Sequence, residues 1–80
     1  MRYADSRCTY TEQLSPTHCY VFTGPCVVTG KPYSVTVKAD ELFAYRQGQL
    51  AQNAFKSLSA GDREFLISGT SPEGWEKMWK

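Results

Sequence analysis

A chain of 80 residues is long enough for one small domain, and its net charge of +1 argues against a dedicated nucleic-acid binder or an acidic nucleic-acid mimic. No apolar run approaches the roughly 18 residues of a membrane span, and the first six residues lack the layout of a signal peptide, so we expect a cytoplasmic protein without membrane contact. Three cysteines, an odd number without a secretion signal, argue against a disulfide framework.

The first seventeen residues are polar and show no sustained apolar periodicity, and Pro16 lies near their end. This composition is typical of a poorly ordered terminus. We therefore expect an irregular N-terminal arm over 1–17, followed by a single compact α+β domain over 18–80. A short strand within the arm that pairs with the sheet is the alternative.

Residues 19–23, 26–29 and 33–37 have the composition of strands, and a Gly/Pro breaker separates each segment from the next. Over 33–37, apolar side chains at the odd positions alternate strictly with hydroxyl side chains at the even positions. The pattern predicts two or three antiparallel strands joined by tight turns.

After Val37 the apolar period becomes helical. Asp40 and Glu41 place negative charge at a helix start, where the helix dipole favours it. Gly48 interrupts the run and marks either a kink or the C-cap between two short helices. The expected core face has two neighbouring rows of side chains. The first row is Phe43, Gln47, Leu50 and Ala54, and the second row, which widens it, is Leu42, Ala51, Phe55 and Leu58.

Capping patterns indicate two further helices. Residues 59–62 have the form of a capping box, in which the Ser59 hydroxyl accepts a backbone N–H and Asp62 reaches back. Gly69 can end that helix in the left-handed conformation. The next helix begins at 71–73 with a capping serine, a proline and an acidic residue, all of which suit a helix start.

The last helix carries Trp75, Met78 and Trp79 on one face. We expect this face to pack on the hairpin, because a domain of this size cannot spare so much apolar area. Self-association through the two tryptophans is the alternative if they lie outside the core. Lys77 and Lys80 suit the negative end of the helix. The expected fold class is α+β, a small antiparallel β-hairpin or three-stranded sheet followed by two to three short packed helices.

The segments LFAYRQGQLAQNAF at 42–55 and LSAGDREFLISG at 58–69 resemble a family of small phage and prophage proteins, and the resemblance extends roughly from Tyr20 to Trp79. Members of this family often carry two C-x-x-C pairs, one in the hairpin before a Gly-Lys and one before the last helix. That layout is zinc-ribbon-like, with four thiolates around one metal.

At the corresponding positions this chain has Cys26 and Thr29, then Ser71 and Gly74. Three of the four thiolates are replaced, since threonine and serine are poor zinc ligands and glycine offers none. The resemblance therefore implies a degenerate zinc ribbon that has lost its metal and uses no cofactor. Its aromatic side chains would then supply the stability that a metal gives.

A rearranged zinc site and a catalytic site are both weakly indicated. The ligand types of a Cys3His zinc centre are present, but their spacing matches no standard knuckle, and adjacent residues 18 and 19 point to opposite faces of a strand. A Cys–His nucleophile would also need an orienting group and an oxyanion hole, which no motif indicates, so we expect no enzyme. The four candidate metal ligands are Cys8, His18, Cys19 and Cys26.

The leading functional hypothesis is protein binding. A compact phage protein without catalytic machinery commonly occupies the surface of a host or phage protein, so inhibition of a host defence system such as CRISPR, or an accessory role in the phage, is expected. Such a protein would act in the host cytoplasm. The contact candidates on the first predicted helix are Tyr45, Arg46, Gln49, Gln52 and Asn53.

The alternative is a nucleic-acid-binding module derived from the zinc-ribbon-like scaffold. Zinc ribbons often bind nucleic acid, and aromatic side chains stack on bases. Nearby acidic residues dilute the basic charge, which favours a mixed surface instead. The candidate contacts are Lys31, Lys38, Arg46, Lys56 and Arg63.

Overall fold

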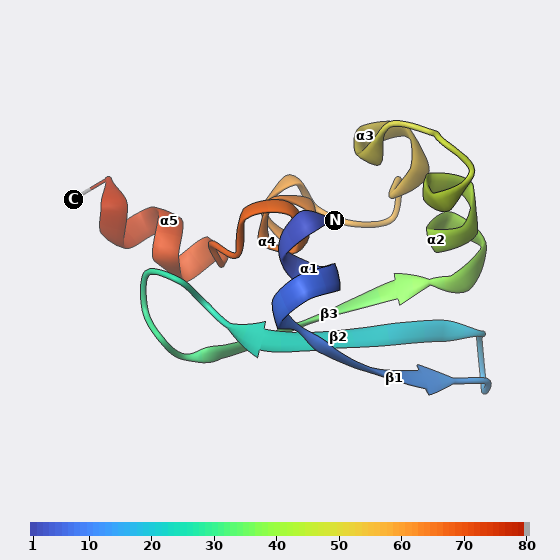
Figure 1. The fold of residues 1–80 in the computed structure, drawn as a ribbon, viewed down its shortest axis with the longest axis horizontal. Helices are drawn as coiled ribbons and strands as arrows, with labels where there is room; N and C mark the ends of the chain where they lie inside the picture. The colour runs from blue at the N-terminus through green and yellow to red at the C-terminus, as the bar shows by residue number, and fades with distance from the viewer. Residues whose placement is uncertain (80) are drawn as a thin grey trace.

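The structure is a computed structural model that describes residues 1–79. Its strands form one antiparallel sheet in the order β1-β2-β3 (Figure 1), which confirms the expected α+β class and the three-stranded sheet followed by helices. The strands are β1 (Thr9–Gln13), β2 (Cys19–Pro25) and β3 (Pro32–Lys38). The helices are α1 (Arg2–Arg7), α2 (Ala39–Arg46), α3 (Ala51–Ala54), α4 (Ala60–Ser68) and α5 (Pro72–Met78).

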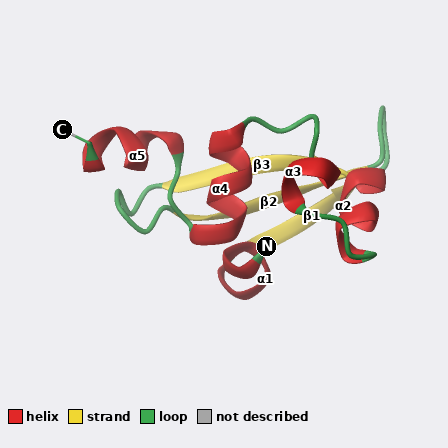
Figure 2. Cartoon of the chain, turned by 90° about the horizontal axis from the view of Figure 1, so that it is seen from above, coloured by secondary structure: helices red, strands yellow, loops and turns green. Residues whose placement is uncertain are grey.

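The helices lie on one face of the sheet, and the core fills the space between the two layers (Figures 1 and 2). Val35 and Val37 of β3 are buried against the helices, whereas Ser34 and Thr36 face solvent, as the alternation predicts. Within residues 1–79, no helix is both long and apolar enough to cross a membrane. The buried core residues are Met1, Ala4, Phe22, Val35, Val37, Leu42, Phe55, Leu58, Phe65 and Leu66.

The third strand of the sheet comes from the N-terminal arm, not from residues 26–29. Those residues belong to the turn between β2 and β3, where the Cys26 N–H donates to the Lys31 carbonyl and the Gly30 N–H donates to the Cys26 carbonyl, both at 2.8 Å. Gly30 has a φ of +74°, which residues with a side chain rarely adopt. Hydrogen bonds within the turn, together with one from the Val27 N–H to the Gly69 carbonyl at 3.0 Å, therefore set its shape.

The prediction of an irregular arm over 1–17 is wrong for much of that segment. It forms α1 and then β1, which pairs with β2 from Thr9 opposite Thr23 to Gln13 opposite Cys19, so the alternative of a strand in the arm is confirmed. Ala4 is buried in the core. The domain consequently begins at the first residues, because the arm completes both the sheet and the core, and the boundary at 17–18 is wrong.

Gly48 ends a helix and does not kink one. α2 stops at Arg46, Gly48 has a φ of +110°, and the single turn of α3 begins at Ala51. Because the chain turns here, the expected continuous apolar face does not form, and Phe43 and Leu50 are exposed. The members of the two rows that are buried are Leu42, Ala54, Phe55 and Leu58.

The predicted caps of α4 and α5 are confirmed. The Ser59 hydroxyl accepts the Asp62 N–H at 3.1 Å, and the Ser71 hydroxyl accepts the Gly74 N–H at 3.2 Å. Gly69 ends α4 with a φ of +86°. The Asp62 carboxylate does not reach back to its own helix end, because it accepts a hydrogen bond from the Tyr33 hydroxyl at 2.5 Å.

The expectation that the α5 face belongs to the core is wrong for Met78 and Trp79. α5 projects past the end of the sheet (Figure 1), and Trp79 is 80% exposed. The buried residue of α5 is Gly74, one turn earlier, and Trp75 is half-buried. The apolar spacing is correct, but the helix extends beyond the surface that would cover it. Lys80 lies outside the described residues.

Candidate functional site

The four positions of the zinc-ribbon-like layout converge in space, although their sequence separation reaches 48 residues. Cys26 lies in the β2–β3 turn and Ser71 caps α5, and the Ser71 N–H donates to the Cys26 sulfur at 3.3 Å. Thr29 lies three residues after Cys26 in the same turn and helps to lower the pKa of the Cys26 thiol. A β-carbon built on Gly74 would lie 2.8 Å from the same sulfur. The turn and the start of α5 therefore form one closely packed cluster around Cys26.

This cluster changes the acidity of the thiol. Burial raises the pKa of Cys26, but hydrogen bonds from Ser71 and Thr29 stabilise the thiolate by more and lower the pKa to about 6. The side chain is 2% exposed, so a large reagent has little access to it. One thiolate beside two hydroxyls and a glycine offers a single strong metal ligand, which does not fit a zinc centre of four ligands.

The rearranged metal set does not assemble. His18 pairs with Glu12 at 2.6 Å, while Cys19 lies next to Gln13, with its sulfur 3.7 Å from the amide oxygen. Cys8 lies elsewhere, against Gly24. Among residues 1–79, no group of three or more histidine, cysteine or acidic side chains is arranged to hold a metal ion. The candidates are separated because each belongs to a different strand position or turn.

Exposed apolar side chains occur on the β2–β3 turn and at the C-terminal end of α5, two elements that lie side by side at one end of the molecule (Figure 1). The point where a Gly74 β-carbon would lie is 3.2 Å from the Val28 β-carbon, so the helix and the turn touch. Met78 follows Gly74 by one helical turn and thus lies on the same side of α5. We call this set of side chains the apolar end and define it as Val27, Val28, Met78 and Trp79.

Sequence reasoning found two members of the apolar end but assigned them to the core. It missed Val27 and Val28, which are 60% and 39% exposed, because a Val-Val pair is typical of a strand. The signal that could have placed Val27 in a turn is the pair of breakers around it, Gly24-Pro25 before it and Gly-Lys-Pro directly after Thr29.

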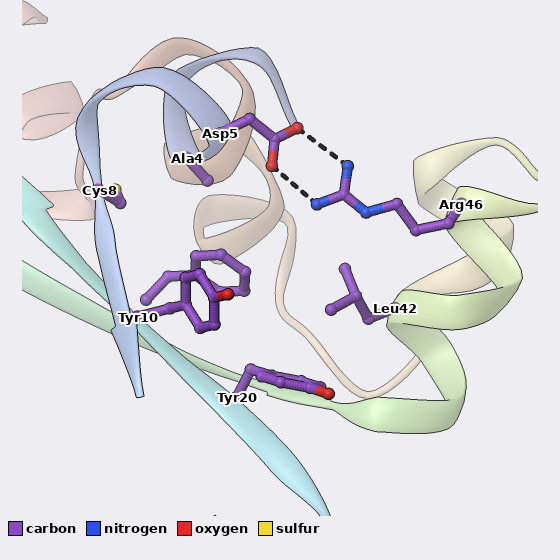
Figure 3. A pocket seen from close by; sticks show the side chains of 8 residues that line it. Ala4, Asp5, Cys8, Tyr10, Tyr20, Leu42 and Arg46 are labelled. Atoms are coloured by element: carbon purple, nitrogen blue, oxygen red, sulfur yellow. Dashed lines mark hydrogen bonds and ion pairs between the residues drawn. The ribbon is translucent and has the colours of Figure 1, made fainter. Parts of the chain in front are cut away.

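A pocket lies between the N-terminal arm and α2 (Figure 3). It has a volume of about 260 Å³, with Tyr10 and Tyr20 on the sheet side and Leu42 on α2. The Asp5 carboxylate and the Arg46 guanidinium form a two-point ion pair, with contacts of 2.8 and 3.1 Å. The pocket therefore combines this internally paired ion pair with aromatic and aliphatic side chains. Sequence reasoning missed it, since its walls come from α1, β1, β2 and α2.

The predicted protein-contact residues do not form one helix face. Tyr45 is half-buried and stacks on Phe55 with ring centroids 5.1 Å apart, so it is part of the packing and not a free contact. Arg46 is held by Asp5. The remaining candidates are exposed and lie after α2 or on α3, and they are Gln49, Gln52 and Asn53.

The basic candidates do not form a stripe either. Lys31 lies 3.3 Å from Glu73, and Arg63 donates to the carbonyls of Phe55 and Leu58, where it supports the loop before α4. Lys38 and Lys56 are exposed and lie at the end of β3 and in the loop after α3. A phosphate backbone is usually followed by a continuous row of cations, which this distribution does not supply.

Comparison with family models, with curated proteins and with solved structures found no match to this chain.

Proposed function

We propose that this protein acts without catalysis by binding another protein through its apolar end. The observation that carries the proposal is the exposure of Trp79 and Met78, at 80% and 50%, at the end of the helix that packs against the turn with the two exposed valines. A domain that buries little surface gains stability from every covered tryptophan, so one left in solvent points to a binding role. Tryptophan is also the residue type most enriched among the anchors of protein interfaces.

The partner in this proposal is a host or phage protein, and the choice of this class is supported by the resemblance to small phage proteins. Inhibition of a host defence system such as CRISPR and an accessory role in the phage both fit this mode of action. Scattered and paired basic side chains make nucleic acid the weaker candidate.

The experiment is affinity capture from a lysate of phage-infected bacteria, followed by reconstitution with the purified partner. We expect a complex that survives high salt, because apolar anchors depend little on ionic strength. Trp79→Ser should weaken binding of that partner more than tenfold. Leu50→Ser is the matched control, since Leu50 is 64% exposed but lies outside the apolar end.

Two outcomes would overturn the proposal. One is a partner that Trp79→Ser binds as tightly as the wild type does. The other is a complex with nucleic acid that dissociates steeply as salt rises, which is the behaviour of phosphate contacts.

A further inference from the structure

The two edges of the sheet are protected to different degrees. β3 begins with Pro32, which donates no N–H, and ends with Lys38, and both residue types discourage pairing with another strand. β1 contains neither proline nor lysine, and all five of its residues are exposed. Within residues 1–79 its outer edge has no partner strand. An unprotected edge of this kind is a template for a further strand.

The single charge on β1 is turned away from that edge. Glu12 accepts hydrogen bonds from within its own molecule, with His18 at 2.6 Å and the Tyr20 hydroxyl at 3.3 Å. A charged side chain normally opposes strand addition by remaining solvated at the edge. Here the carboxylate is hydrogen-bonded to Tyr20 of β2 and to His18, which directly precedes β2. The edge therefore presents mainly hydroxyl, amide and aromatic groups.

We propose that β1 pairs antiparallel with β1 of a second copy, with Thr11 opposite Thr11 on a twofold axis. In this register Tyr10 faces Glu12 of the second copy, and Thr9 faces Gln13 of the second copy. A threonine pair is a favourable neighbour across strands, and no two like charges oppose each other. The edge is thus complementary to itself, which a twofold interface requires.

The same register covers exposed apolar side chains. Tyr10 and Leu14 are 63% and 72% exposed in the single chain. Continuing the register places Leu14 opposite Cys8 of the second copy, and Tyr10 becomes an interior position of a six-stranded sheet. In such a dimer the helices of both copies lie on the same face. Because α5 and the β2–β3 turn lie beyond one end of β1 (Figure 1), the twofold axis places the two apolar ends at opposite ends of the sheet. The dimer therefore presents the proposed partner surface twice.

The test is the oligomeric state of the full chain, measured by native mass spectrometry and by sedimentation over a concentration series. Thr11→Lys places two lysines opposite each other on the axis without changing the pairing of β1 with β2. Like charges directly opposite cost up to about 1 kcal/mol, so the dimer should be weaker by up to roughly fivefold. Thr36→Lys is the matched control, because Thr36 is also an exposed strand residue but lies on β3.

A mixture of Thr11→Lys with Thr11→Glu should restore dimers and form mixed pairs in preference to either variant alone. Trp79→Ser should leave the dimer unchanged, which separates this interface from the apolar end. A wild-type monomer at high concentration would overturn the proposal. So would a dimer that Thr11→Lys leaves intact or that Trp79→Ser abolishes.

Discussion

A β-carbon built on Gly74 would lie 2.8 Å from the sulfur of Cys26, closer than real β-carbons approach a neighbouring atom. The same point is 3.1 Å from the Thr70 methyl carbon and 3.2 Å from the Val28 β-carbon. α5 can therefore lie against the β2–β3 turn only because position 74 lacks a side chain. This contact also determines where the apolar end projects.

Gly74→Ala is expected to destabilise the protein, although alanine favours a helix by about 1 kcal/mol over glycine. The added methyl group must displace a buried sulfur and two other neighbours, and overpacking of this kind costs about 1–3 kcal/mol. Denaturant unfolding should show a lower free energy of unfolding.

The double variant Cys26→Ala/Gly74→Ala tests the cause. Removing the sulfur makes room for the methyl group, so the two substitutions together should cost less than the sum of each alone. Strict additivity would show that the clash with Cys26 is not the reason for the loss.

The free energy of unfolding should depend on pH through Cys26. Its pKa is lowered from 9 to about 6 in the native state, so between these values the unfolded chain holds a proton that the native chain has released. Stability from this group is therefore fully present above pH 9 and is lost as the pH falls to about 6, with a slope of at most about 1.4 kcal/mol per pH unit.

Unfolding curves across that range, with thiolate absorbance read in parallel, measure the effect. Cys26→Ala should remove the slope, whereas Cys19→Ala should keep it. An equal slope in the wild type and in Cys26→Ala would contradict the assignment.

Tyr33 should titrate late. Burial first, and then the hydrogen bond to Asp62, raise its pKa from 10 to about 12. The neutral phenol is thus the form that the fold stabilises, so its contribution is complete below pH 10 and is lost as the pH rises towards 12. Tyr33→Phe should cost about 1.5–3 kcal/mol near neutral pH, because the phenol donates to a carboxylate. Tyr10→Phe, at an exposed position, should be nearly neutral in the same unfolding assay.

Docking of the N-terminal arm can be tested within one helix. Ala4 is 2% exposed, whereas Ser6 faces solvent two residues later. Ala4→Asp buries an unpaired charge and should cost about 3 kcal/mol or more, while Ser6→Asp should stay within about 0.5 kcal/mol. Thermal unfolding followed by circular dichroism compares the two, and equal melting temperatures would mean that α1 is not packed on the core.

Zinc should not bind in stoichiometric amounts, because only one of the four layout positions supplies a thiolate. Native mass spectrometry of protein from zinc-supplemented cultures is expected to give the mass of the chain alone, and a chelator should leave the unfolding curve unchanged. One retained zinc ion per chain would contradict this expectation and raise nucleic-acid binding above protein binding.

The elements that the sequence predicted well are those set by residues close along the chain. The hydroxyls of Ser59 and Ser71 each accept a hydrogen bond from a backbone N–H three residues ahead. Gly48 and Gly69 have positive φ angles, which glycine adopts readily because it has no β-carbon. Alternation in β3 likewise depends on which face of one strand is apolar. In each case the deciding interaction joins residues a few positions apart, so the pattern of residue types predicts it.

Tertiary structure alone decided the features on which the proposals rest. β1 is polar throughout and exists as a strand because β2 offers a partner, and Trp79 is exposed because α5 extends past the sheet. Cys26 meets Ser71 only when the turn and α5 come together across 45 residues. Residue types along the chain located the caps of α4 and α5, because those hydrogen bonds are local, whereas α1 was missed because no side chain caps its start. Which side chains are buried depends on how far each helix extends over the sheet, and a pattern of neighbouring residue types does not predict that extent.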